Sequence, residues 1–138
     1  MSPQRTIKYR GGYNESHLKE KLNKQVLMRF PKRIKENMLA FENGDFLRIP
    51  TEKEIFGKNC ESPEEPETVK QWEPMRQKKN RLAFLGKFID NNPLAWYWLE
   101  NSDSFGHFLT AGGYKGTIGS TSVRVWCGVR PVFQLKNC

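Results

Sequence analysis

The stretch of sequence that decides the fold is Ala95-Trp96-Tyr97-Trp98-Leu99-Glu100, together with Gly128-Val129-Arg130-Pro131-Val132-Phe133-Gln134-Leu135 nearer the C-terminus. Both runs are apolar, rich in aromatic and β-branched residues, and bounded by Gly, Pro, Asn or Ser. This composition is typical of buried strands. The two runs are therefore predicted to be strands of one sheet, and most of the preceding chain is predicted to cover that sheet as helices.

Length and composition predict one globular domain that spans residues 1–138. A chain of this size can enclose one hydrophobic core, and 37% hydrophobic with 12% aromatic residues are sufficient to fill it. The mean hydropathy is −0.73, so neither a transmembrane segment nor a membrane partner is expected. Residues 1–12 are basic but lack the apolar stretch of a secretory signal, which predicts an intracellular chain or a trimmed precursor. Residues 1–13 are expected to be a loose N-terminal segment or an edge strand.

The formal net charge of +8 is unevenly distributed along the chain. Residues 1–36 contain ten lysines and arginines against three acids, residues 37–75 four against nine, and residues 76–138 nine against three. A nucleic-acid-binding protein gathers its positive charge along one surface, and sequence alone does not say whether the two basic segments meet. Nucleic-acid binding is therefore kept as an alternative function, and a solvated basic surface is the simpler explanation.

The spacing of apolar residues predicts an amphipathic helix near the N-terminus. Leu18, Leu22 and Val26 recur every four residues, and charged residues fill the opposite face. Asn14 or Ser16 is the candidate N-cap.

A second, shorter helix is predicted after Pro31, because proline disfavours helical geometry in the residue before it yet fits the first turn of a new helix. Ile34 and Met38 are its apolar positions, and Asn43-Gly44 is a turn pair that ends it. The two helices are expected to form a hairpin whose apolar stripe covers the later strands.

The middle of the chain contains a short helix with clear boundary signals. Thr51 and Glu54 have the spacing of a capping box, and Gly57 is placed to end the helix after one or two turns. Glu52 and Glu54 are alternatively a candidate acid/base pair, but the capping role is the expected one. Residues 46–49 before this helix predict a short strand.

Residues 58–70 are predicted to be a mobile loop, because they are acidic and interrupted by prolines. Calcium binding is the alternative interpretation of the clustered carboxylates, but the regular EF-hand spacing is missing and no metal is expected. Residues 76–81 contain four cations near Trp72, which suit either an exposed turn or a patch for phosphate and stacked bases.

The last third of the chain predicts an antiparallel meander. Apolar runs at 82–85, 96–100 and 105–109 are separated by turn sequences, and residues 114–126 are predicted to be a polar connection to the final run. The pattern does not alternate strands with crossover helices. The predicted fold class is therefore α+β, with helices packed on an antiparallel sheet.

The cysteines and histidines do not predict a metal site or another cofactor. Cys60, Cys127 and Cys138 show no CxxC spacing, and His17 and His107 are the only histidines that could join them. A structural zinc site uses four nitrogen or sulfur ligands, usually in two close pairs. A disulfide between the first two cysteines stays open for an exported protein, and three free thiols are the simpler expectation.

Four segments together resemble a known family. They are residues 45–57 (DFLRIPTEKEIFG), 71–83 (QWEPMRQKKNRLA), 96–101 (WYWLEN) and 128–133 (GVRPVF), in this order and approximate spacing. The family is DUF6273, a group of bacterial and prophage domains of unknown function that is related to the C-type-lectin-like fold. Residues 14–41 also resemble the helical part that precedes these motifs, so the similarity covers most of the chain.

The resemblance implies two N-terminal helices packed on small antiparallel β-sheets, adjacent chain ends and long loops that present a binding surface. This sequence departs from the family pattern in two ways. Family members usually carry further strand-forming sequence upstream, where this sequence has only residues 1–13, and Glu100 replaces the arginine that usually follows the tryptophan and leucine. The Glu-Pro-Asn, Gln-Pro-Asp and Trp-Asn-Asp triplets of calcium-dependent lectins are absent from the sequence, so calcium is not implied.

The resemblance further implies a non-catalytic recognition or structural module of bacterial or prophage origin, with a protein or a glycan as ligand. In some relatives the segment before the closing strand is a diversified receptor-binding surface, and residues 105–126 occupy that position here. The expected contact residues are Phe105, His107, Tyr114, Arg124 and Trp126, and the expected supporting residues are Trp98, Arg130 and Phe133. Rigid aromatic and adaptable hydroxyl side chains are typical of such a surface, although the same residues also form ordinary hairpin turns.

An enzyme is the remaining alternative, and it would use a thiol. Cys127 adjoins an aromatic strand and His107 is the candidate base, but nothing in their spacing brings them together. No enzymatic activity is therefore expected. Arg130 has a structural alternative, because its fork of donors can satisfy carbonyls and a carboxylate at once. The expected location is the cytoplasm, a phage particle or the cell surface.

Overall fold

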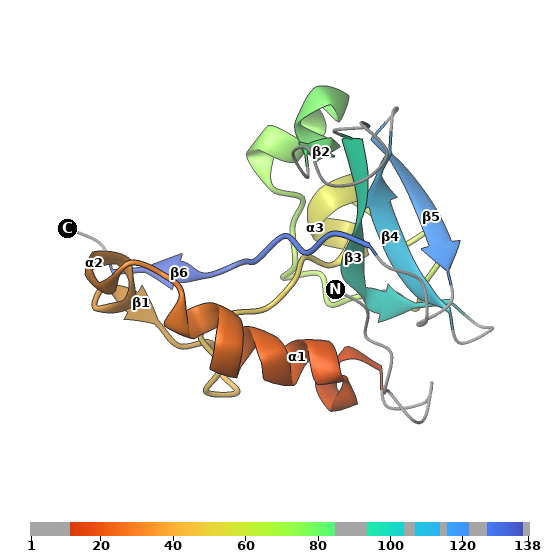
Figure 1. Ribbon diagram of the computed structural model, residues 1–138. Coiled ribbons are helices and arrows are strands. Elements are labelled where there is room, and N and C mark those ends of the chain that lie inside the picture. Colours follow the sequence, from red (N-terminus) through yellow and green to blue (C-terminus); the bar gives the residue numbers. More distant parts are fainter. Residues whose placement is uncertain (1–11, 85–93, 104–106, 114–115, 122–126, 137–138) are drawn as a thin grey trace.

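The computed structural model describes residues 12–84, 94–103, 107–113, 116–121 and 127–136. These residues combine short helices with small antiparallel sheets, so the α+β class is confirmed. Figure 1 shows a helical part, which contains α1, α2, β1 and β6, beside a four-stranded sheet that carries α3.

The helices and strands of the described residues are short. The helices are a 3-10 turn at Tyr13–Glu15, α1 (His17–Lys21), a π-helical turn at Leu22–Val26, α2 (Lys32–Lys35), α3 (Glu52–Phe56) and 3-10 helices at Glu73–Arg76 and Lys78–Arg81. The strands are β1 (Met38–Leu39), β2 (Ala83–Phe84), β3 (Leu94–Ser102), β4 (Phe108–Gly112), β5 (Thr117–Thr121) and β6 (Gln134–Leu135).

β3 is the central long strand of the sheet, whose order is β2-β3-β4-β5 with antiparallel neighbours. Because side chains alternate across a strand, β3 directs Tyr97 and Leu99 to one face and Trp98 to the other. All three side chains are buried. The strand predicted from the first apolar run is therefore confirmed.

The two faces of the sheet carry separate clusters of buried side chains. The face that packs on α3 contributes to a cluster of Ile55, Met75, Tyr97, Leu99, Leu109 and Ala111. The opposite face contributes to a cluster with the N-terminal helix, which contains Tyr13, Leu18, Leu22, Met38, Leu47, Ile49, Trp98 and Phe108. Coverage on both faces explains why the central strands are apolar at consecutive positions rather than alternating with polar residues.

The edge of β3 that faces away from β4 is completed by three separate segments. β2 pairs with the first residues of β3. Further along, Gly128 accepts a hydrogen bond from the backbone N–H of Trp98 at 3.1 Å and donates one to the carbonyl of Trp96 at 2.7 Å. Beyond it, the N–H of Glu100 donates to the carbonyl of Pro50 at 2.9 Å. A buried strand thus finds backbone partners on this edge without one continuous neighbour.

The run at 128–135 does not form a strand along β3, so the prediction that both apolar runs share one sheet is wrong. Gly128 makes a single parallel bridge to β3. Pro131 follows and cannot donate to a ladder, and the chain leaves the sheet there. Val132 then bridges to Arg48, and β6 pairs with β1 in a second, two-stranded sheet. This run joins the two parts of the molecule, as the blue segment of Figure 1 shows.

The N-terminal helix agrees with its prediction in start and orientation. Ser16 is the N-cap, and its hydroxyl oxygen accepts from the backbone N–H of Lys19 at 3.2 Å. Leu18 and Leu22 are fully buried in the cluster that includes Trp98. The predicted contact between this helix and the aromatic strand is confirmed.

The second helix is shorter than predicted. α2 ends at Lys35, and Met38 belongs to β1, where it lies opposite Leu135 of β6. The spacing of Ile34 and Met38 fits a helix, but pairing with the distant C-terminal segment determines the local structure. The Asn43-Gly44 turn is present, with Gly44 at a φ of 89°.

The sequence predicted that residues 114–126 form a polar connection. This prediction is wrong for Thr117–Thr121, which form β5. The five residues of β5 pair with β4 throughout. β5 ends the strand order of the sheet and shows little apolar alternation, so periodicity did not reveal it. Gly119 leaves room for Trp96, since a Cβ atom there would lie 3.1 Å from Cζ3 of the indole.

Asn23 joins the N-terminal helix to the segment around Leu47. Its Oδ1 accepts from the backbone N–H groups of Phe46 and Leu47 at 2.9 and 3.0 Å, and its Nδ2 donates to the Leu47 carbonyl at 2.9 Å. We expect Asn23→Ala to lower the free energy of unfolding by about 2–3 kcal/mol, because these backbone groups lose their partner. Chemical denaturation measures the change. The exposed Gln25→Ala is the control, with an expected change within about 0.5 kcal/mol, and similar losses in both variants would contradict this role.

Candidate functional site

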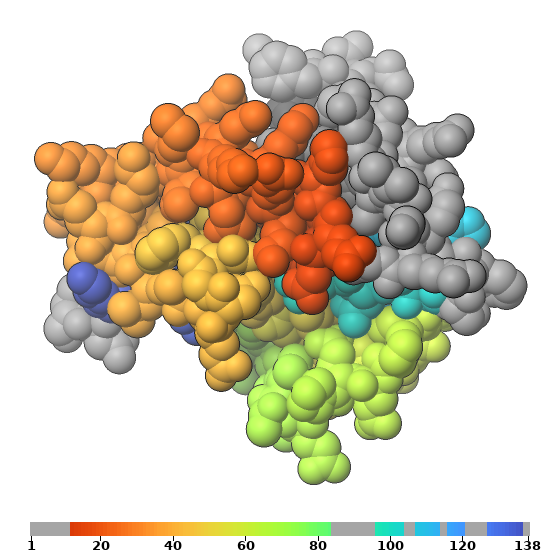
Figure 2. Space-filling model, turned by 90° about the horizontal axis from the view of Figure 1, so that it is seen from below, coloured from red at the N-terminus to blue at the C-terminus, as the bar shows by residue number. Residues whose placement is uncertain are grey.

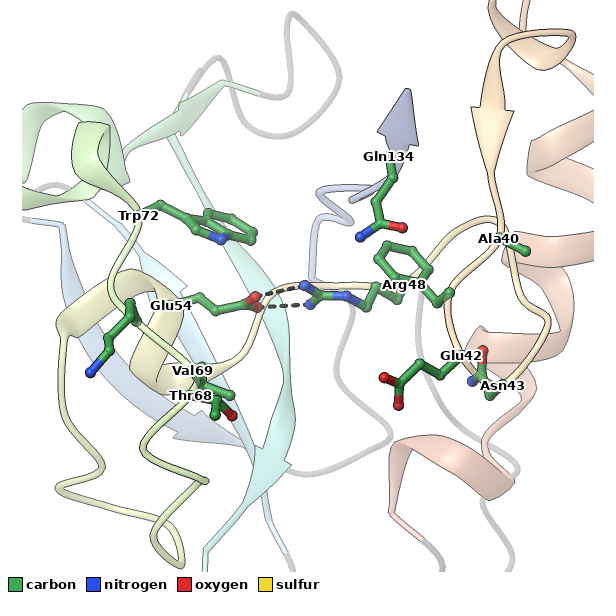
Figure 3. A pocket seen from close by; sticks show the side chains of 11 residues that line it. Ala40, Glu42, Asn43, Arg48, Glu54, Thr68, Val69, Trp72 and Gln134 are labelled. Atoms are coloured by element: carbon green, nitrogen blue, oxygen red, sulfur yellow. Dashed lines mark hydrogen bonds and ion pairs between the residues drawn. The ribbon is translucent and has the colours of Figure 1, made fainter. Parts of the chain in front are cut away.

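A pocket of about 760 Å³ lies between the helical part and α3 (Figure 3). Four parts of the chain meet there: the loop that follows β1, α3, the loop before the Glu73–Arg76 helix, and β6. Lining residues include Phe41, Glu42, Asn43, Arg48, Glu54, Thr68, Lys70, Trp72 and Gln134.

The pocket contains a paired arginine and glutamate. Nη1 and Nη2 of Arg48 donate to Oε1 and Oε2 of Glu54 at 2.7 and 2.6 Å, which is the bidentate geometry of a strong ion pair. Burial acts to lower the pKa of Arg48, but the hydrogen bond and charge of Glu54 outweigh it and raise the pKa. Arg48 also donates to the carbonyl of Ile49 at 3.1 Å. Both charges are therefore largely satisfied within the protein.

Two aromatic rings flank this ion pair. The guanidinium carbon of Arg48 lies 4.9 Å from the ring centre of Phe41 and 6.0 Å from that of Trp72, both within cation–π range. The backbone N–H of Trp72 donates to the Glu54 carbonyl at 2.9 Å, which fixes the tryptophan beside α3. Figure 3 shows the Trp72 ring near Glu54 and Gln134 near Arg48. The pocket therefore presents flat apolar surfaces next to charged atoms.

The rim of the pocket is polar and balanced in charge. Glu42 and Lys70 are exposed and opposite in sign, and Asn43, Thr68 and Gln134 add amide and hydroxyl groups. No serine, cysteine or histidine is among the described residues that line the pocket. The arrangement suits binding by stacking and hydrogen bonds more than it suits proton or group transfer.

The first turn of α3 is fully capped, and this settles the role of Glu54. The N–H groups of Glu52, Lys53 and Glu54 donate to Asn101 Oδ1, Glu65 Oε2 and Thr51 Oγ1 at 2.7, 3.1 and 3.3 Å, respectively. Glu54 Oε1 in turn accepts from the Thr51 N–H at 3.0 Å, so the predicted capping box is confirmed. The predicted end of the helix at Gly57 is also confirmed.

Glu52 holds the acidic loop against α3. It is 1% exposed, and its carboxylate accepts from Ser62 Oγ at 2.6 Å and from the N–H groups of Cys60 and Glu61 at 3.0 and 3.1 Å. Residues 58–70 form no helix or strand, in agreement with the predicted loop, and these bonds join part of them to α3. In the described part of the chain, the acids form no group that could hold a metal ion.

The structure describes one of the five predicted contact residues. His107 is exposed, and its Nδ1 lies 3.3 Å from Oδ2 of Asp103. The other four, Phe105, Tyr114, Arg124 and Trp126, lie outside the described residues.

The three predicted supporting residues are all in contact with the interior. Trp98 is buried and meets Phe108 edge to face, with ring centres 6.0 Å apart. Phe133 is half-buried and meets Phe30 in the same way at 5.3 Å. Arg130 donates to the carbonyl of Asn80 and to the hydroxyl of Tyr97 and lies over the Tyr97 ring, so one predicted carbonyl partner is present, and a phenol stands where a carboxylate was predicted.

The two described cysteines, Cys60 and Cys127, are reduced thiols that no disulfide joins. The alternative of a disulfide between them is therefore wrong in this structure. Burial raises the pKa of Cys127 to about 11, so its thiol is protonated at neutral pH. Cys138 lies outside the described residues.

Sequence reasoning missed the pocket as a site. The chain offers signals for single parts of it, namely the capping box that places Glu54 and the aromatic Trp72 after the acidic loop. It offers no signal that Arg48 would pair with Glu54 or that Phe41 and Trp72 would both lie near the Arg48 guanidinium.

Comparisons of the chain with protein-family models, curated proteins and solved structures find no match. Among the described residues, no helix has the length and apolar character needed to cross a membrane.

Glu100 is a half-buried acid near the end of β3, between the two halves of the molecule. Burial raises its pKa to about 7, and the negative charges of Glu54 and Glu65 act in the same direction against the lowering effect of Arg48. Between the usual pKa of a glutamate and about 7, the folded state therefore binds more protons than the unfolded state, and the free energy of unfolding falls as the pH rises.

We expect Glu100→Gln to remove this dependence. The variant should unfold with a higher free energy than the parent above pH 7, by on the order of 2 kcal/mol, because it no longer buries a charge. Denaturation at several pH values between 4 and 8 measures the difference, with the exposed Glu64→Gln as a control that keeps the parent's profile. An unchanged profile in Glu100→Gln would show that another group causes the pH dependence.

Proposed function

We propose that the chain is a non-catalytic recognition module of bacterial or prophage origin with a C-type-lectin-like fold, and that its pocket holds a ligand. An antiparallel sheet with helical elements on both faces, and a C-terminal strand that returns beside the N-terminal helices, support the fold proposal. The observation that carries the function is the pair of rings, Phe41 and Trp72, that both lie within cation–π range of Arg48 in the satisfied Arg48–Glu54 ion pair.

A neutral, polar ligand with one flat apolar face fits this pocket best. The charges in the pocket balance, since Arg48 pairs with Glu54 and the rim carries Glu42 and Lys70. A sugar ring can stack its C–H face on an aromatic side chain while its hydroxyl groups bond to carboxylate and amide groups. A glycan is therefore the first ligand class to test, and a protein segment is the second.

The absence of enzymatic activity is part of the proposal. Both oxygens of Glu54 are engaged by Arg48, and the oxygens of Glu52 are engaged by the acidic loop. The protonated thiol of Cys127 is a poor nucleophile at neutral pH.

Recognition through residues 105–126 remains a second proposed surface of the same module. It is supported by the rigid base that β4 and β5 provide, where Phe108 and Leu109 are buried. His107 adjoins this base and is exposed.

Trp72→Ala tests the pocket. We expect calcium-independent binding to a glycan array and to individual glycan hits, and a loss of about tenfold or more in affinity for this variant, because a central aromatic contact disappears. Phe46→Ala is the matched control, since Phe46 is an aromatic residue at the surface that does not line the pocket.

Two further variants separate binding from folding. Trp72 packs against the cluster on α3, so its loss also affects folding. The affinity and the melting temperature are therefore also measured for two milder variants: Gln134→Ala, at a more exposed position on the rim, and Trp72→Phe, which keeps an aromatic ring. A loss in Gln134→Ala with an unchanged melting temperature supports the pocket. Binding that survives all pocket variants but disappears in Tyr114→Ala with Trp126→Ala would move the site to residues 105–126, and no binding to any glycan or protein would overturn the proposal.

A further inference from the structure

The helical part carries most of the net positive charge of the chain. Residues 17–39 and 134–136 contain eight lysines and arginines against two glutamates, a net charge of +6, whereas the other 112 residues contain 15 against 13. The two segments lie side by side because β6 pairs with β1. We call these residues the basic lobe.

The cations of the basic lobe lie on its outer surface. The inner face of the N-terminal helix is occupied by Leu18 and Leu22, which are fully buried. The exposed cations are Lys21, Lys24, Arg29, Lys32, Arg33, Lys35 and Lys136. Figure 2 shows the helical residues, in red and orange, as one continuous surface on this side of the molecule.

Few of these cations are neutralised within the protein. The two glutamates of the basic lobe each pair with a lysine four residues away, at N–O distances of 2.8 and 3.7 Å. Such exposed pairs are weak and exchange readily with other ions. Lys21, Arg29 and Arg33 form no ion pair with an acid in the described part of the chain.

We propose that the basic lobe binds the phosphate backbone of a nucleic acid. The helical residues 17–28 extend over about 18 Å, which is long enough to face several consecutive phosphates of one strand. A row of cations that neutralises several phosphates releases their bound counterions, and this release supplies most of the affinity. Contacts from lysine and arginine to phosphates carry no sequence information, so we expect binding that depends on phosphate and not on base sequence.

The apolar residues of the basic lobe argue against a membrane as its partner. A helix that lies on a bilayer inserts an apolar face, but here the apolar face is used by the core through Leu18 and Leu22. The basic lobe exposes three large apolar residues, Met28 at 75%, Leu39 at 43% and Leu135 at 49%, and of these only Met28 lies on this helix, since Leu39 and Leu135 belong to β1 and β6. One methionine among many cations is too little to anchor the helix in lipid.

The chain contains a second basic cluster that serves as an internal control. Residues 76–81 lie beside β2, away from α1 and α2 (Figure 1). Part of this cluster is engaged by the protein, since Arg76 pairs with Glu73 at 3.3 Å and Arg81 donates to the Met75 carbonyl at 2.8 Å. The proposal predicts that this cluster contributes little.

The test measures binding of the full chain to a short fluorescent DNA duplex across a range of salt concentrations. We expect the logarithm of the affinity to fall with the logarithm of the salt concentration with a slope of about −3 or steeper. The variant with Lys21→Glu, Arg29→Glu and Arg33→Glu should bind at least about tenfold more weakly at low salt. The control with Arg76→Glu, Lys78→Glu and Lys79→Glu changes the net charge equally and should stay within about twofold of the parent, because its residues lie outside the proposed surface.

Three results would overturn the proposal: no salt-dependent binding at low salt, equal losses in both triple variants, or binding to phosphatidylserine vesicles but not to DNA. Melting temperatures confirm that the variants fold, and Lys21→Gln with Arg29→Gln and Arg33→Gln repeats the test without new negative charge. A single-stranded RNA of equal length tests the same phosphate chemistry, and tenfold weaker binding of the Glu variant to it also supports the proposal. This surface is separate from the pocket, so the result is independent of the glycan experiment.

Discussion

The structure depends on the backbone of β3, which is buried and must find hydrogen-bond partners on both edges. β4 supplies one edge as an antiparallel neighbour, with a shift in register between Trp98 and Ser102. The other edge is assembled from β2, Gly128 and Pro50, which come from three distant parts of the sequence. Two of these partners lead directly into another feature: Pro50 into the capped helix α3, and Gly128 into the run that reaches β6. The arrangement of the segments around the pocket follows from the hydrogen-bond partners that the backbone of this single strand finds.

Local signals in the sequence predicted the parts of the fold that depend on nearby residues. The N-cap at Ser16, the capping box of Thr51 and Glu54, and the apolar strand around Trp98 all involve groups within a few residues of one another. Two parts were missed for different reasons: Met38 joins β1 because the distant β6 pairs with it, whereas β5 pairs with its neighbour in sequence, β4, but shows little apolar alternation. Periodicity does not encode such pairings, so the sequence predicted neither.

The candidate site shows the same division between local and distant determinants. Glu54 was placed correctly on its helix, but the sequence did not indicate that Arg48 would pair with its carboxylate or that Phe41 and Trp72 would both lie near the Arg48 guanidinium. The charge distribution shows the same division. The sequence showed two basic segments but not their positions in space, and the structure places most of their described cations apart from each other. Residues 17–36 gather on the helical part, and residues 76–81 lie by β2. The pocket, neutral in sum, sits between the helical part and α3.

The three-part edge of β3 has a consequence for how the chain folds. Its partners are separated from it by about thirty to fifty residues for Pro50 and Gly128, so several long loops must close before this edge is covered. Until the last of them arrives, a long apolar strand presents free N–H and C=O groups to other molecules. During synthesis Gly128 emerges last of the three, and the nascent chain is open to association between copies at this strand until that residue is in place.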